Sequence, residues 1–314
     1  MKKEFLWSQR LGFSNQQAFA IQKLGMERLL QQSFQAPFNT SIPELLSDSP
    51  KSLEDLKKIR QTRKEDSEAG KELLKKEIQT SNELKAWWID EMKTTEFPLR
   101  EKMTLFWYHF IPVDFEFVKQ SSNEFCNTNS ARICYKYMKM FRDNATGNYK
   151  ALIREMATQP AMMFYLNNQA NTKTAPDENF AREVMELFTL GKDEDSQYTE
   201  ADVIQAAKVL TGWRVQNLNT TAEATNFVES LHDTSTKKFS SFFNNTVIPN
   251  TGAGEPDLFI DMIFSKSKVV SEYICRRLYR FFVYYDIDAD IEANVIVPLA
   301  QHFVANNWNV LPVL

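Results

Sequence analysis

Two amphipathic helices joined by a short link are the strongest structural pattern in this chain. Residues 174–191 read TAPDENFAREVMELFTLG, and residues 199–212 read TEADVIQAAKVLTG. Apolar side chains recur at helical spacing in both segments, which predicts one buried face on each helix. They are Phe180, Val184, Leu187, Phe188, Val203, Ala207 and Leu210. Because the link at 192–198 is short, we expect the two helices to pack against each other.

Polar residues at the ends of both segments set the expected helix boundaries. Thr174 with Asp177, and Thr199 with Asp202, have the spacing of a capping box, in which each side chain accepts a hydrogen bond from the other residue's backbone. A glycine follows each helix, at residues 191 and 212, and can adopt the left-handed conformation that ends a helix.

The first helix has a polar flank with more functional groups than packing requires. Asn179, Glu183 and Glu186 occur at i, i+4 and i+7, so they share one side of the helix, with Arg182 one turn before Glu186. Such a flank could bind a cation, orient a water molecule or hold a polar ligand. The alternative is a solvated face with structural ion pairs, and spacing alone favours that alternative.

Composition favours a mainly α-helical fold. The 314 residues include only 8 glycines and 11 prolines, which argues for long helices over many tight turns. We therefore predict one multi-helical globular domain over residues 1–314, with a small β-hairpin at 238–250 that turns at Asn244–Asn245. Residues 51–77 hold nine Lys or Arg and seven Asp or Glu, so we expect a charged helical hairpin within 50–95 that projects from the domain.

Charge and hydropathy bear on partners and compartment. The net charge of −4 gives no indication of a nucleic-acid surface. No run of about 18 apolar residues occurs, so we expect no transmembrane segment. The amino terminus, MKKEFLWSQRLGFS, has no apolar core of signal-peptide length and reads as the start of a helix. As given, the chain is expected to be cytoplasmic, with a surface or periplasmic location as the alternative if a leader was removed.

A second candidate site lies in the segment LHDTSTKKF. His232 beside Asp233, with Lys237 four residues on, offers an imidazole, a carboxylate and an ammonium on a loop. In the catalytic hypothesis His232 is a general base oriented by Asp233, while Glu183 and Glu186 position a water molecule or a cation. The alternative is a turn in which Asp233 caps the local backbone, and it is favoured because this cluster matches no known mechanism.

The remaining motifs give little evidence of a functional site. His109 and Trp213 are further candidates for ligand contact, although a lone histidine at a helix end is more often structural. Three scattered cysteines predict buried free thiols. No phosphate-binding loop, dinucleotide fingerprint or zinc-protease motif occurs, so the metal and the cofactor are left unassigned.

Several of these segments together resemble the bacterial domain of unknown function 1800 family. The resemblance rests on AREVMELFTLG, YTEADV and LTGW in the helix pair, on HDTSTKKF, and on YRFFV at 279–283. It implies a helical bacterial protein that is often surface-associated and carries no settled activity. The genes of the family often neighbour those of a sulfatase-like family, domain of unknown function 1501, so a sulfatase-like protein is the implied partner.

The chain departs from the pattern of this family at several polar positions. It has Trp107-Tyr108-His109-Phe110 where two histidines are usual, and Ser240 follows Phe239 where the family has Leu-Gly. Members of the family continue past the position of Leu314, so we expect the carboxyl-terminal end of the domain to be missing.

Two functions follow as hypotheses. In the first, a polar site on the 179–186 helix and the 232–238 loop binds or acts on a polar substrate such as a surface glycan derivative. In the second, the chain is a non-catalytic interaction or scaffold protein, whose aromatic residues or basic face at Arg276, Arg277 and Arg280 contact a partner protein.

Overall fold

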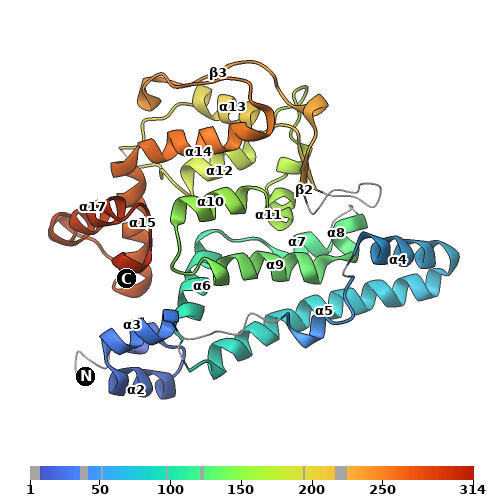
Figure 1. Cartoon of the computed structure of the whole chain (residues 1–314), viewed down its shortest axis with the longest axis horizontal. Coiled ribbons are helices and arrows are strands. Elements are labelled where there is room, and N and C mark those ends of the chain that lie inside the picture. Colours follow the sequence, from blue (N-terminus) through green and yellow to red (C-terminus); the bar gives the residue numbers. More distant parts are fainter. Residues whose placement is uncertain are drawn as a thin grey trace. The chain divides into compact units, whose positions relative to one another are not determined.

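The computed structural model is mainly α-helical, as predicted, with two small antiparallel sheets (Figure 1). It describes residues 8–35, 42–50, 52–96, 98–120, 124–193, 195–215 and 225–314. The first residues of the predicted amino-terminal helix, 1–7, lie outside this range. The chain divides into two compact units, one of Met1–Thr146 with Phe281–Tyr285 and the other of Gly147–Arg280 with Asp286–Leu314. That the chain forms a single domain stays a prediction.

The elements described in the first unit are helices. In chain order these are α2 (Asn15–Leu24), α3 (Met26–Gln35), η1 (Glu44–Leu46), α4 (Leu53–Glu65), α5 (Ser67–Thr94), α6 (Leu99–Phe110), α7 (Phe115–Lys119), α8 (Glu124–Thr128) and α9 (Ser130–Asp143). The long helix α5 packs along α9, and α4 runs back along α5 as an antiparallel partner (Figure 1).

The α4–α5 hairpin turns at a single residue. Asp66 has an extended backbone (φ −134°), which ends α4, and its side chain accepts hydrogen bonds from the backbone N–H groups of Glu68 and Ala69, which begins α5. A capping box between Ser52 and Asp55 fixes the other end of α4. The residues from 64 to 68 are exposed, so charged side chains at the turn remain hydrated.

The second unit surrounds the predicted helix pair. Its elements are α10 (Tyr149–Ala157), α11 (Pro160–Tyr165), η2 (Asn168–Ala170), α12 (Asn179–Glu186), α13 (Glu200–Val209), β1 (Trp213–Val215), β2 (Thr225–Phe227), η3 (Glu229–Leu231), β3 (Lys237–Lys238), η4 (Ser241–Phe243), β4 (Val247–Ile248), η5 (Gly252–Gly254), α14 (Glu255–Ser265), α15 (Ser267–Phe282), α16 (Ala289–Ile291), η6 (Glu292–Ile296), α17 (Val297–Ala305) and η7 (Leu311–Val313). The last two residues of α15 belong to the first unit. α12 packs against α13, as predicted, and α13 also contacts β3 and α14.

Two short β-hairpins follow this helix pair. β3 pairs with β4 (Lys237 opposite Ile248), and the connection contains Asn244 and Asn245 at positive φ, so the predicted hairpin is confirmed. β1 pairs with β2, with Trp213 opposite Phe227. This second pair was not predicted from the sequence.

The boundaries of α12 differ from the prediction. The capping box of Thr174 and Asp177 was wrong: the helix starts later, and Asp177 accepts a hydrogen bond from the backbone N–H of Asn179 at 2.9 Å. The helix also ends before the glycine, so Leu187 lies in a turn and is 44% exposed, whereas it was predicted to be buried. The capping box of Thr199 and Asp202 is confirmed.

None of the helices, within the residues that the structure describes, is long and apolar enough to cross a membrane.

Candidate functional site

A buried ionic network in the second unit contains two of the residues predicted for the 232–238 loop site, the catalytic candidate His232 and the ligand-binding candidate Lys237. Glu255, at the start of α14, lies between His232 and Lys237, and all three side chains are almost completely inaccessible to solvent. Nε2 of His232 lies 2.8 Å from Oε1 of Glu255, and Nζ of Lys237 lies 2.7 Å from Oε2. The ammonium also donates to the backbone carbonyl of Asp233. Each charged group therefore has an oppositely charged partner, as a buried ion requires.

The other ring nitrogen of His232 contacts Thr211. Nδ1 lies 2.9 Å from the carbonyl oxygen of Thr211 and 3.1 Å from its hydroxyl oxygen. A carbonyl oxygen only accepts, so a hydrogen bond to it requires the hydrogen on Nδ1. Both ring nitrogens are thus held by groups of the protein itself.

Asp233 is engaged in the local turn. Its Oδ1 accepts hydrogen bonds from the backbone N–H and the hydroxyl of Ser235, and its own N–H donates to Oγ1 of Thr211 at 2.8 Å. Burial acts to raise the pKa of Asp233, but the two hydrogen bonds and the charge of Lys237 outweigh it and hold the pKa below its usual value. These contacts are those of the turn that the sequence analysis gave as the alternative.

A glycine makes this arrangement sterically possible. Gly212 follows α13 and has φ +88°, a left-handed conformation that favours glycine. A Cβ there would lie 3.0 Å from the carbonyl oxygen of Val228 and 3.1 Å from Cβ of His232. The predicted stop after α13 therefore also lets the chain bring His232 close to Thr211.

Most of the charges on the predicted α12 flank form ion pairs. Arg182 donates to Glu200 (2.7 and 2.8 Å) and to Glu178 (3.0 Å), and Glu186 lies 3.1 Å from Nζ of Lys192. Asn179 is exposed, and its amide donates to the carbonyl of Leu166 at 3.4 Å. Arg182 and Glu186 are partly buried, but their partners Glu200 and Lys192 are exposed, so each pair contributes little to stability.

Glu183 and Tyr198 are different, because neither side chain has an ion pair or a hydrogen bond among the described residues. Burial and the neighbouring charge of Glu186 raise the pKa of the Glu183 carboxyl. The hydroxyl of Tyr198 is buried, and burial followed by the charge of Glu186 raises its pKa to about 12. An acceptor and a donor without internal partners thus lie close to Glu186.

The two further candidate residues, His109 and Trp213, belong to different units. His109 is exposed at the end of α6, in the first unit. Trp213 is half-buried in β1 with its ring centroid 5.6 Å from that of Phe227. No group of three or more His, Cys, Asp or Glu within the described residues is arranged to hold a metal ion. Cys126, Cys134 and Cys275 are buried and form no disulfide among the described residues, as predicted.

The family model for the protein of unknown function DUF1800 matches residues 6–314. The chain belongs to this family. The resemblance of the helix pair and the HDTSTKKF segment is thereby confirmed over nearly the whole length. No curated protein shows significant similarity to the chain. No solved structure shows significant similarity either.

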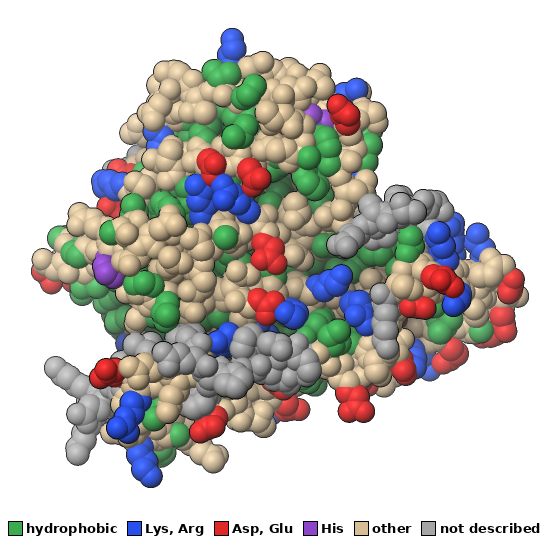
Figure 2. All heavy atoms as spheres, viewed as in Figure 1, with side chains coloured by type: hydrophobic (Ala, Val, Ile, Leu, Met, Phe, Trp, Pro, Cys, Tyr) green, Lys and Arg blue, Asp and Glu red, His purple; other side chains and the backbone are tan. Residues whose placement is uncertain are grey.

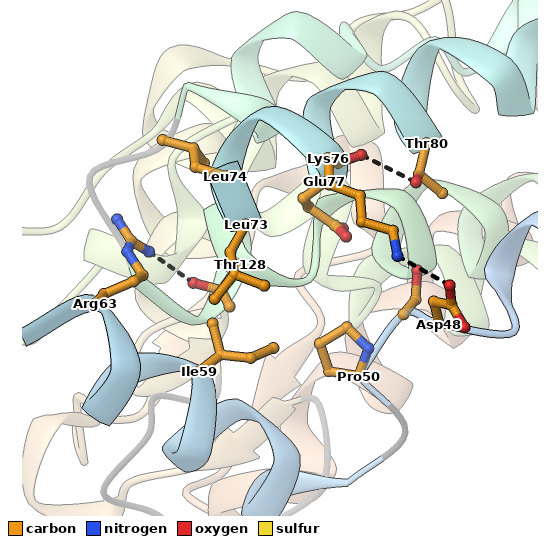
Figure 3. Close-up of a pocket in the computed structure, with 11 residues that line it drawn as sticks. Asp48, Pro50, Ile59, Arg63, Leu73, Leu74, Lys76, Glu77, Thr80 and Thr128 are labelled. Carbon is orange, nitrogen blue, oxygen red and sulfur yellow. Dashed lines mark hydrogen bonds and ion pairs between the residues drawn. The ribbon is translucent and has the colours of Figure 1, made fainter. Parts of the chain in front are cut away.

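In this DUF1800 protein the first unit also has a hollowed surface, on the α4–α5 hairpin. A cavity of about 80 Å³ lies between α4, α5 and residues 48–50, and Figure 3 shows Ile59, Leu73 and Glu77 around it. A wider groove of about 940 Å³ adjoins it along α4, α5 and η1. The two share five lining residues, which are Asp48, Ile59, Leu73, Lys76 and Thr80. Figure 2 shows Lys, Arg, Asp and Glu side chains intermingled over this hairpin.

Sequence reasoning missed three of the central residues. Glu255 precedes Pro256 in the first turn of a helix. An acidic residue there normally interacts favourably with the helix dipole, so its position gives no indication of a buried partner. Thr211 was seen only as part of the LTGW motif. Glu77 was counted among the balanced charges of the hairpin, although it is only 8% exposed.

Proposed function

We propose that this DUF1800 protein is a non-catalytic interaction protein that binds a partner protein in the groove along α4 and α5. The observation that carries the proposal is that both ring nitrogens of His232 are engaged by other groups of the protein. A general base has to reach the proton that it removes, directly or through one water molecule. His232 is fully buried, and both of its ring nitrogens are occupied by Glu255 and Thr211. This network favours a structural role in the second unit.

The groove offers what a protein interface needs. Apolar side chains lie in it among charged ones, and its volume of about 940 Å³ can accept several side chains of a partner. The apolar members are Leu45, Ile59, Ala69 and Leu73. The charged members are of both signs: Lys58, Lys75 and Lys76, with Glu44, Asp48, Glu72 and Glu83. Such mixed charge supports specificity for one partner more than general attraction to a charged surface.

The basic face that the sequence suggested as a docking site supports the proposal less. Arg276 is already paired with Glu292 at 2.6 Å, with Glu272 at 3.3 Å and with Asp193 at 3.5 Å. A partner would have to compete with these internal carboxylates. The first partner to test is the sulfatase-like protein that the family resemblance implies.

The experiment is a binding titration with two matched substitutions on the same helix. Ala69 lines the groove, so Ala69→Phe places a ring in it, whereas Ala86→Phe adds the same ring at an exposed position of α5 that does not line it. We expect the Kd for the sulfatase-like protein to rise at least about tenfold in the first variant and to stay unchanged in the second. Equal binding by both variants would contradict the role of the groove.

A second candidate function is the binding of a small polar ligand on the α12 flank. It is favoured by Glu183 and Tyr198, whose polar groups have no internal partner among the described residues. A thermal-shift screen with divalent metals, sulfate, phosphate and polar sugars tests it on the wild type and on Glu183→Ala. A ligand at about a hundred times its Kd stabilises by ~2.7 kcal/mol, a shift of at least about two degrees. A shift in the wild type alone supports this site, and equal shifts in both proteins contradict it.

A further inference from the structure

Glu77 links α5 to the start of α9. Its Oε1 accepts a hydrogen bond from the backbone N–H of Ala131 at 2.7 Å and from the hydroxyl of Ser130 at 3.5 Å. Asn129, at the N-cap position of α9, makes no capping hydrogen bond with its own side chain. Glu77 therefore supplies, from another helix, the acceptor that a helix N-terminus normally receives from its N-cap.

The carboxyl group of Glu77 also borders the cavity of about 80 Å³ under α4 (Figure 3). It is a buried carboxyl without an ion pair among the described residues. Burial raises its pKa to about 7, although the hydrogen bonds from Ala131 and Ser130 and the charge of Arg132 act in the opposite direction. Near neutral pH this carboxyl is thus divided between its neutral and ionised forms.

Two of the charged groups around Glu77, Arg63 and Lys76, are engaged with other residues. Arg63 of α4 donates to Asn127 (3.3 Å) and Thr128 (3.0 Å), and Lys76 of α5 pairs with Asp48 at 2.9 Å. From α9, Arg132 acts on Glu77 through its charge, while burial raises the pKa of Cys134 so far that it stays a neutral thiol.

We propose that Glu77 makes the α4 cover of this cavity responsive to pH: the neutral carboxyl keeps α4 closed, and the ionised carboxylate favours an open state that admits water. A carboxylate held out of water without a counter-ion is costly, and hydration of the cavity relieves that cost. Because Glu77 belongs to α5, its bond to Ala131 survives when α4 moves. α4 joins α5 through the single residue Asp66, about which it would turn on opening, and Arg63 connects α4 to Asn127 and Thr128 of α8.

The direction of the effect follows from linkage. The pKa of Glu77 is about 7 in the closed state and close to the ordinary 4.5 once the group is hydrated. Raising the pH therefore favours opening. With these two values, the opening constant should be about tenfold larger at pH 8 than at pH 6.

Hydrogen–deuterium exchange of the full chain tests the proposal. We expect the protection factors of residues 53–65, corrected for the intrinsic effect of pH, to fall about tenfold from pH 6 to pH 8. Glu77→Gln keeps an acceptor for Ala131 but does not titrate, so it should remove this pH step. Glu83→Gln neutralises an exposed carboxylate on the same helix and should keep the step.

A further variant separates the contribution of Arg63 from that of the titrating group, Glu77. Arg63→Gln should lower the protection of α4 at pH 6 and still show a fall towards pH 8. The proposal is overturned if the wild type shows no pH step, or if Glu77→Gln retains it. If Glu77→Gln does not fold, the shape of the wild-type curve decides: protection that falls with rising pH and levels off near pH 7 supports the proposal, and a curve that levels off at any other pH overturns it. Binding of a partner in the neighbouring groove is not needed for any of these outcomes.

Discussion

Nε2 of His232 lies 2.8 Å from Oε1 of Glu255, and neither side chain reaches solvent. The same carboxyl group also holds Lys237, so one residue of α14 fixes a loop and a strand that follow α13. Breaking a buried ion pair by removing one partner costs more than the pair itself contributes, because the remaining charge stays buried and unpaired.

Glu255→Gln should therefore strongly destabilise the protein. The amide offers no negative charge to Lys237, and we expect the free energy of unfolding to fall by about 3–5 kcal/mol. Urea unfolding followed by circular dichroism measures the loss. Glu229→Gln is the control, since Glu229 is exposed on η3, and it should have a negligible effect. Equal stability of the two variants would mean that Glu255 does not hold the network together.

Glu77 should make stability depend on pH in a defined direction. Its folded pKa of about 7 lies above the ordinary value of 4.5, so the folded state binds the proton more tightly than the unfolded state. The stabilisation is complete below pH 4.5 and is lost as the pH rises to about 7. Relative to Glu77→Gln, the wild type should lose at most about 3 kcal/mol over that window.

Unfolding midpoints in urea from pH 5 to pH 8, measured for both proteins, check this expectation. Glu83→Gln serves as the control, because it removes an exposed carboxylate from the same helix and should parallel the wild type. If the stability of the wild type relative to Glu77→Gln rose with pH instead, the expected direction of the pH dependence would be wrong.

The helix pair shows how far the sequence determines the fold. The Thr199–Asp202 capping box and the Asn244–Asn245 turn are local, so residue types and spacing were sufficient to predict them. The start of α12 was misplaced because Asp177 caps the helix at Asn179 without the help of Thr174. Local competition between two possible caps is decided by the surrounding structure.

The candidate site was predicted less well, because its key contacts join distant parts of the chain. His232 and Lys237 were identified from their spacing, but Glu255 lies 23 residues from His232 and looks like any acidic residue at a helix start. Likewise nothing local distinguishes Glu77 from the exposed Glu72. The pattern of charges along a helix indicates which face is exposed, but it does not indicate which residue of another element packs against that helix.

Gly191 should tolerate no side chain. Its φ is +78°, and a Cβ would lie 2.7 Å from the ring of Tyr273, whose hydroxyl donates to the carbonyl of Leu187 at 2.9 Å. Gly191→Ala combines left-handed strain with a clash, so we expect a loss of more than about 2 kcal/mol in urea unfolding. Gly252→Ala is the matched control: its φ is +61°, and a Cβ there would make only an ordinary contact, 3.4 Å from the ring of Phe227. That variant should lose only about 1 kcal/mol. Similar losses in both variants would show that the contact with Tyr273 is unimportant.

Gly70 should control how closely α4 approaches α5. A Cβ at this position would lie 2.9 Å from Cα of Arg63, so the two backbones pass each other where no side chain fits. Gly70→Ala gains about 1 kcal/mol of helix propensity, but it pushes the end of α4 away from α5. Since Arg63 also makes the contacts with Asn127 and Thr128, the displacement should weaken them.

Hydrogen–deuterium exchange of α4 and of α9 then separates a local effect of the substitution from a global one. We expect Gly70→Ala to lower the protection of residues 53–65 at pH 6, while the core of α9 keeps its protection. Ala69→Gly is the counterpart one residue earlier: it loses a similar amount of helix propensity without adding an atom between the helices. Unchanged protection of α4 in Gly70→Ala would show that this close approach does not hold the hairpin shut.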